Sequence, residues 1–131
     1  MSYTLYDYVD IHGDNAIKEW TLALQPPDRT KFNVKLNMLR TAGSDLPPKL
    51  LSDTRSPHIK KLRFFGQGQK QLRPMLCKGP VNSNIEFTLL LGAEEKGSKL
   101  NPIDADHRAE ILRQQIIANP NARRRLHEHV K

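Results

Sequence analysis

The chain has 131 residues, with 21 Lys and Arg against 14 Asp and Glu, and a formal net charge of +7. This length suits one domain, and 37% hydrophobic with 27% charged residues is typical of a globular rather than a disordered or fibrous chain. A single cysteine excludes an internal disulfide, and no apolar stretch approaches the roughly 20 residues of a membrane span. Because the N-terminal residues lack a basic and an apolar region, we expect no secretory signal and a cytoplasmic protein. Because Cys and His at zinc-binding spacing are absent, we expect no metal, and no other cofactor is predicted.

The positive charge is concentrated in the middle of the sequence. Residues 1–28 hold one Lys and five acids, residues 29–78 hold twelve Lys and Arg against two Asp, and residues 79–131 hold eight cations and seven acids. The net charges of these segments are therefore −4, +10 and +1. Such a density of one sign favours a polyanionic partner. The alternative is a solvated basic face that only keeps the protein soluble.

The periodicity of apolar residues predicts seven elements. In chain order they are a strand over residues 3–11, helices over residues 14–24 and 28–42, strands over residues 58–65, 71–77 and 84–91, and a last helix that begins near Pro102 and ends before Asn119. Asp14 or Asn15 would cap the first helix, and Asp28 the second. Pro26 and Pro27 would separate the two, since proline cannot continue a helix. Their short connection predicts an antiparallel helical hairpin.

The intervening segments are expected to be loops. Residues 44–57 are rich in Pro, Ser and Asp, and residues 94–101 are polar. The near-continuous apolar run from Phe87 to Leu91 predicts a central strand covered on both faces. The fold class is therefore α+β, with a helical hairpin and a C-terminal helix packed on an antiparallel-rich sheet in the order β-α-α-β-β-β-α. Residues 1–118 would form one domain, and residues 119–131 a basic tail that frays as a helix or is disordered.

Several segments, taken in order, resemble one protein family. They are Trp20, Leu46-Pro47-Pro48, Lys49-Leu50-Leu51, Ile59-Lys60-Lys61-Leu62-Arg63, Leu72-Arg73, Phe87 to Gly92, and Asn101-Pro102 with Ala109 and Arg113. This set is similar to the RelE/ParE superfamily of small bacterial toxins, and most of all to its HigB-like, phage-derived branch. The resemblance covers nearly the whole chain and implies a RelE-like fold.

The sequence also departs from the family pattern. Lys61 stands where the family usually has Glu, and Leu72 stands where an aromatic residue is common. Glu94-Glu95-Lys96 replaces a more basic run. No tyrosine follows Tyr8, so the C-terminal tyrosine that some relatives use has no counterpart in this chain.

The resemblance implies a type II toxin that cleaves mRNA on the ribosome, with the 2′-OH of the RNA attacking the adjacent phosphate without a metal. The protein must then supply a base, cations that stabilise the phosphorane, and an acid for the leaving oxygen. The candidate catalytic residues are Arg63 and Arg73, at the positions of the family's paired arginines, and then Lys61, His58 and Lys60. Strand alternation places His58 and Lys60 on one face and Lys61 and Arg63 on the other.

Other basic residues are candidates for supporting roles. The candidate RNA-binding residues are Arg55, Lys70, Lys78, Arg123, Arg124 and Arg125. His107, early in the last helix, could replace the missing tyrosine as general acid. The alternative for each of these is an ordinary solvated side chain, which is the favoured interpretation for Lys78 and His107. Cys77 is interpreted as a buried structural thiol, because no activating partner is recognisable.

The leading hypothesis is therefore an mRNA endoribonuclease toxin. Its expected partners are the ribosome, mRNA and a small cognate antitoxin of the helix-turn-helix type that covers the face of Arg63 and Arg73. Operator DNA would be bound only through the antitoxin complex, and no membrane partner is expected. Two alternatives remain open at this point: a ParE-like inhibitor of DNA gyrase without nuclease activity, and an inactive phage relative that only binds RNA or a partner.

Overall fold

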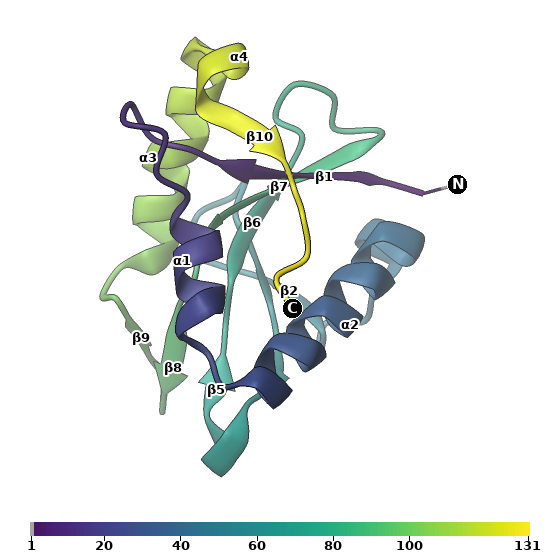
Figure 1. Ribbon diagram of the computed structural model, residues 1–131, viewed down its shortest axis with the longest axis vertical. Coiled ribbons are helices and arrows are strands. Elements are labelled where there is room, and N and C mark those ends of the chain that lie inside the picture. The colour runs from purple at the N-terminus through teal and green to yellow at the C-terminus, as the bar shows by residue number, and fades with distance from the viewer. Residues whose placement is uncertain (1) are drawn as a thin grey trace.

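The computed structural model describes residues 2–131, and it contains two β-sheets and four α-helices within that range (Figure 1). The larger sheet consists of β1 (Thr4–Tyr8), β2 (Leu51–Asp53), β3 (Lys60–Leu62), β6 (Met75–Lys78), β7 (Glu86–Leu91) and β10 (Arg124–Leu126). The smaller sheet consists of β4 (Phe64–Phe65), β5 (Gln71–Leu72), β8 (Glu94–Lys96) and β9 (Lys99–Asn101). The helices are α1 (Ala16–Ala23), α2 (Pro26–Ala42), α3 (Ala105–Ala118) and α4 (Pro120–Arg123), and two 3-10 turns are η1 (Gly43–Asp45) and η2 (Gln67–Gln69).

The larger sheet has the strand order β10-β1-β7-β6-β3-β2, and the smaller one β4-β5-β8-β9. All neighbours are antiparallel except β1 and β7, which run parallel. The α+β class and the predominance of antiparallel pairing are thus confirmed. The parallel pair makes the larger sheet mixed, because the chain passes through both helices and most of the sheet between β1 and β7.

Each face of the larger sheet has its own apolar core. One core lies under α1 and α2 and includes Ile17, Phe32 and Leu36 of these helices against Phe87 and Leu89 of β7. The other lies under α3, where Ala105, Ala109 and Ile116 pack with Met75, Cys77 and Leu90 of the sheet. The alternation of β7 between the two cores confirms the prediction of a central strand covered on both faces.

The two N-terminal helices diverge from their junction as an open V in front of the sheet (Figure 1). The side chain of Asn15 caps α1 by accepting a hydrogen bond from the backbone N–H of Lys18. The expected cap of α2 is wrong: the helix begins at Pro26, with Gln25 as N-cap, and Asp28 lies in its first turn. Proline tolerates the first helical turn, since its missing N–H would have no intrahelical partner there.

Both long strands expected in the middle of the chain are broken. Residues 58–65 form β3 and β4 on either side of Arg63, and residues 71–77 form β5 and β6 on either side of Arg73 and Pro74. The hairpin therefore leaves the larger sheet and enters the smaller one. Pro74 has no N–H for a ladder, and its carbonyl accepts from Leu62 at 3.0 Å.

Three other segments differ from the sequence prediction. The expected loop over residues 44–57 contains η1 and β2, and the expected polar loop over residues 94–101 is the hairpin β8–β9. Pro102 precedes the last helix by three residues, and Asp104 is the N-cap. These errors share a cause, because strands of two or three residues are fixed by their partners in the sheet rather than by local propensity.

The C-terminal residues are not a frayed helix or a disordered tail. They form α4 and then β10, which pairs antiparallel with β1 and is the edge strand of the larger sheet. The remaining chain runs back across the front of the molecule toward α2 (Figure 1). Asn33 of α2 donates to the carbonyl of Val130 at 2.9 Å. Among the described residues, no helix is long and apolar enough to cross a membrane.

Two histidines join this C-terminal segment to the fold. His127 Nδ1 lies 2.8 Å from Asp7 Oδ1, His127 Nε2 lies 3.0 Å from His129 Nδ1, and His129 Nε2 lies 2.9 Å from Asn37 Oδ1. A neutral His129 ring can donate from Nε2 to Asn37 Oδ1 and accept at Nδ1. Burial, and then the charges of His127 and Arg40, lower the pKa of His129.

The lowered pKa of His129 predicts acid-sensitive stability. A neutral imidazole in the fold stabilises it fully above the unfolded pKa of about 6.5, and this contribution is lost as the pH falls through the lower folded value. Urea unfolding between pH 8 and pH 5 should therefore show a falling midpoint. The fall should be smaller for His129→Gln, which carries no titrating group; an equal fall in both proteins would contradict this assignment.

Gly92 provides a test of the packing under α1. A Cβ at this position would lie 2.0 Å from Cδ2 of Trp20, whose ring makes an edge contact with Phe32 at 5.5 Å. Gly92→Ala should therefore destabilise the fold by about 1–3 kcal/mol in urea unfolding, the usual cost of overpacking. In the background of Trp20→Leu the same change should cost clearly less, since the clashing ring is gone.

Candidate nucleic-acid interface

Arg63 and Arg73 lie together at the junction of the two sheets. The backbone N–H of Arg63 donates to Leu50 at 2.7 Å, and that of Arg73 donates to Ala93 at 2.8 Å. Each arginine is thereby tied to a segment outside its own hairpin, so the position of its side chain is set by tertiary contacts. Both side chains line one groove.

Arg73 is 1% exposed, which is unusual for an arginine. Its Nη1 donates to the carbonyls of Leu72 at 2.9 Å and Phe64 at 3.4 Å, and its Nη2 donates to Gln71 Oε1 at 3.0 Å. A guanidinium has five N–H donors. One hydrogen on Nη2 and the one on Nε are therefore left without an acceptor within hydrogen-bond distance in the described structure.

The charge of Arg73 is only partly compensated. Its Nε lies 3.6 Å from Glu95 Oε1. Burial lowers the pKa of Arg73, and the neighbouring Arg63 lowers this pKa further, whereas Glu95 raises it. Arg63 also has a buried Nε without an acceptor among the described residues. The two guanidinium groups thus carry more positive charge than nearby acids compensate, and more N–H donors than nearby acceptors satisfy.

The groove beside them is lined by apolar and cationic side chains. Its volume is about 560 Å³, and it is lined by Thr30, Lys31, Val34, Lys35, Lys49, Leu50, Arg63, Phe64, Phe65 and Arg73. Within residues 2–131, no acidic side chain lines it. We call it the cationic groove. Lys31 is oriented by a hydrogen bond from its Nζ to the carbonyl of Phe65 at 3.3 Å.

Lys61 does not line the cationic groove. Its Nζ donates to Glu95 Oε1 at 2.9 Å, and it lines a different cavity of about 690 Å³. That cavity also contains three aspartates, at positions 53, 104 and 106. Its mixed charge makes it a poorer site for a polyanion than the cationic groove.

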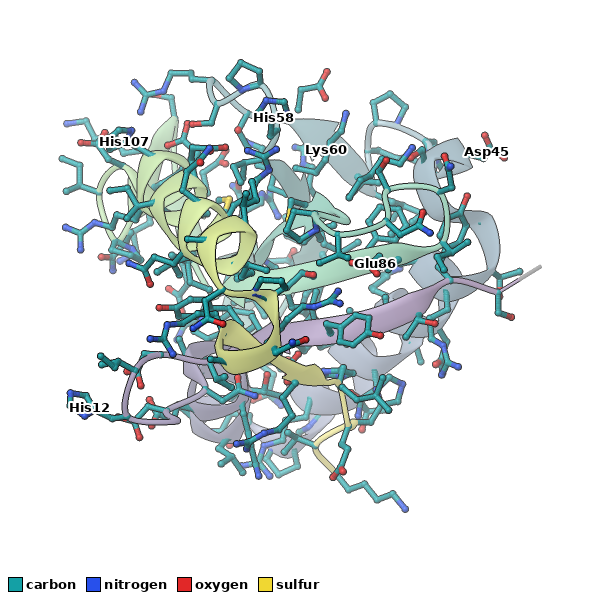
Figure 2. All side chains as sticks on the ribbon, turned by 90° about the horizontal axis from the view of Figure 1, so that it is seen from above. His12, Asp45, His58, Lys60, Glu86 and His107 are labelled. Carbon is teal, nitrogen blue, oxygen red and sulfur yellow. The ribbon has the colours of Figure 1, made fainter. Side chains whose placement is uncertain are left out.

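His58 and Lys60 lie together in a third cavity of about 390 Å³, with Lys78 and Arg113 (Figure 2). We call it the His58 pocket. Lys60 is ion-paired with Asp53, and Arg113 Nη1 lies 3.0 Å from Glu110 Oε2. Strand alternation therefore separated Lys60 from Lys61 correctly, but the structure places His58 and the arginine pair in different cavities.

The other candidates are dispersed over the molecule. Arg55 is exposed and pairs with Asp104 at 3.2 Å and with Asp106 at 3.6 Å. Lys70 is exposed at the turn between β4 and β5, and His107 is exposed on the outer side of α3, apart from His58 (Figure 2). Neither Lys70 nor His107 lines the groove that contains the arginine pair.

The basic run of the C-terminal segment is divided by strand alternation. Arg124 pairs with Glu86 and its guanidinium lies 3.9 Å from the ring centroid of Tyr6, so this side chain stabilises β10. Arg125 points to the opposite side and is exposed. The carbonyl of Arg123 accepts from Val9 at 3.0 Å. The three arginines therefore do not form one phosphate-binding surface.

The sequence reasoning missed three lysines of the cationic groove. Lys31 and Lys35 are four residues apart on α2 and hence share a helix face, which is the signal that could have singled them out. Lys49 comes from the loop before β2 and carries no such signal. Glu95 was recognised only as a departure from a family pattern, and its contact with Lys61 and Arg73 is a tertiary feature.

Comparisons with known proteins do not identify the chain: no family model matches it, and neither curated proteins nor solved structures give a match. Among the described residues, no group of three or more His, Cys, Asp and Glu is arranged to hold a metal ion. The candidate interface therefore rests on its own geometry.

Cys77 is fully buried under α3, and burial raises its pKa to about 12. At pH 8 only about one thiol in 10⁴ would then be ionised, and the thiolate is the reactive form. A disulfide reagent should label the folded protein very slowly and the urea-unfolded protein within the mixing time. Fast labelling of the folded protein would contradict the burial of Cys77.

Proposed function

We propose that the chain is a RelE-like toxin, an endoribonuclease that cleaves mRNA on the ribosome, and that the cationic groove binds the message. The observation that carries this proposal is the groove itself. Five cationic side chains line it together with apolar ones, and no acidic side chain of residues 2–131 lines it. A polyanion with flat apolar parts is the ligand that fits such a lining, and single-stranded RNA has this chemistry.

The groove offers separate contacts for the two parts of a nucleotide. Arg63 can bind a phosphate, since a guanidinium meets two phosphate oxygens at once, and the buried Arg73 adds its positive charge beside it. Phe65 is 54% exposed and Val34 is 51% exposed, so a base can stack on the Phe65 ring and pack against Val34. Stacking tolerates every base, which suits an enzyme that reads position on the ribosome rather than sequence alone.

The chemistry that these residues support is electrostatic. Attack of a 2′-OH on the adjacent phosphate adds negative charge to the phosphorane, and preorganised cations stabilise this charge more than that of the ground state. The groups of the groove that can transfer a proton are the amines of Lys31, Lys35 and Lys49. His58 lies in another pocket, so the proposal gives it no part in the reaction at the arginine pair.

The same charges provide a means of inhibition. An antitoxin segment with acidic side chains and an amphipathic surface would neutralise the cations of the groove and cover Val34 and Phe65. Such a partner would exclude RNA directly. It would also explain why so many cations are left unpaired on one face of a free protein.

The proposal predicts that Arg63→Ala abolishes most of the cleavage of mRNA on programmed ribosomes. Removing one donor that stabilises the transition state costs about 10²–10³-fold in rate. Arg63 is preferred to Arg73 for this test because Arg73 is buried and supports the fold. Arg125→Ala removes the same charge from an exposed position outside the groove and should change the rate less than about threefold. His58→Ala should likewise keep its activity.

The outcomes separate the hypotheses. Mapping of mRNA ends should show cleavage by the wild type and by the two control variants, and little cleavage by Arg63→Ala. If His58→Ala is inactive and Arg63→Ala is active, the reaction belongs to the His58 pocket instead. If mRNA stays intact while DNA supercoiling by gyrase stops, the chain is a gyrase inhibitor. An effect on neither process would leave only a binding protein.

A further inference from the structure

Glu95 lies between two of the cations that sequence reasoning assigned to catalysis. Its Oε1 is 2.9 Å from Lys61 Nζ and 3.6 Å from Arg73 Nε. The side chains of Glu95 and Lys61 are 14% and 20% exposed, so water screens this contact weakly. One carboxylate oxygen thus touches both cations, as a non-bridging phosphate oxygen would.

The strand pairing explains why this carboxylate reaches Arg73. In the register of β5 and β8, Gln71 lies opposite Glu95 and Leu72 lies opposite Glu94. Residues two apart on a strand share a face, so Glu95, Gln71 and Arg73 are on the same side of the smaller sheet. The amide oxygen of Gln71 also accepts a hydrogen bond from Arg73 Nη2. The hairpin β8–β9 therefore places the carboxylate of Glu95 next to Arg73.

We propose that Glu95 is an internal competitor of RNA phosphate: it partly neutralises Lys61 and Arg73 and so lowers the affinity of the cationic groove. This inference rests on the proposed function, because it takes RNA as the ligand of the groove. A phosphate bound in the groove beside Arg63 and Arg73 is repelled by the nearby carboxylate, which also offsets the charge of Arg73. Removal of the charge of Glu95 leaves the charges of Arg73 and Lys61 uncompensated and raises the positive potential of the groove, although Lys61 itself lines the neighbouring cavity.

Glu94 offers a matched control. It is the preceding residue of β8, is half-buried like Glu95, and makes no ion pair with any residue of the described chain. Its side chain points to the opposite face of the strand. Glu94→Gln and Glu95→Gln therefore change the net charge equally, and only the second removes the carboxylate between Lys61 and Arg73.

The affinity for a short, fluorescently labelled single-stranded RNA, measured by anisotropy at several salt concentrations, tests the inference. Glu95→Gln should bind about tenfold more tightly than the wild type, because a negative charge that repels the phosphate at close range is removed. Because Lys61 lines the neighbouring cavity and adds no direct phosphate contact, the log–log slope of the salt dependence should change by less than about 0.7, the value for one phosphate contact on a single strand. Glu94→Gln should bind within about twofold of the wild type, because its carboxylate faces away.

A double-mutant cycle locates the effect. Lys61→Met should change RNA affinity little in the wild type, where the Lys61 ammonium is paired with Glu95. In the Glu95→Gln background, Lys61→Met should remove most of the gain in RNA affinity. If Glu95→Gln loses cooperative urea unfolding, Glu95→Asp replaces it in the test. Its carboxylate, one methylene shorter, leaves the 2.9 Å contact with Lys61, and Glu94→Asp is its control.

Equal affinities of the Glu95 and Glu94 variants would overturn the inference, since the effect would then be one of net charge. Weaker binding by Glu95→Gln would also overturn it and would show that Glu95 holds Arg73 in its binding position. In both cases, binding and mRNA cleavage by the wild type would leave the proposed function standing. Absence of RNA binding by the wild type and by every variant would overturn both.

Discussion

The break of the central hairpin at Arg63 and at Arg73–Pro74 is the constraint on which the rest of the structure depends. A proline cannot donate to a strand ladder, and here the carbonyl of Pro74 takes the N–H of Leu62 while the two strands leave one sheet for the other. At this junction Arg73 is buried and Arg63 is half-buried, whereas arginine side chains are usually exposed. It also creates the smaller sheet, whose third strand, β8, brings Glu95 to Arg73.

Burial of a guanidinium at this junction costs free energy that hydrogen bonds must offset. The carbonyls of Phe64 and Leu72 and the amide of Gln71 supply most of that compensation, and Glu95 supplies part of the charge. Arg63 adds a second positive charge without an acid of its own. The resulting excess of charge is directed into the cationic groove, whereas Lys61, Lys60 and Arg113 in the other two cavities are each ion-paired with an acidic side chain.

Sequence patterns predicted the elements that carry long, regular signals. The helices α1 and α2, the boundary at Gly43, and the central strand β7 were placed closely, because each has a cap, a stop or a sustained apolar run. The short strands and the C-terminal strand β10 were missed. A segment such as residues 124–126 becomes a strand only because the open edge of β1 is available to it.

The sequence by itself determined the α+β class and the position of the +10 block, which follow from periodicity and composition and are properties of the chain alone. It also predicted Arg63 and Arg73 as neighbours on adjacent strands; they line one groove, but both lie in breaks between strands. Only the tertiary structure decided which cations share a surface: it joined the arginines to lysines 31, 35 and 49, moved His58 to another pocket, and set Glu95 against Lys61. The physical reason is that burial and charge pairing depend on side chains distant in sequence, which meet only when the sheets and α2 pack.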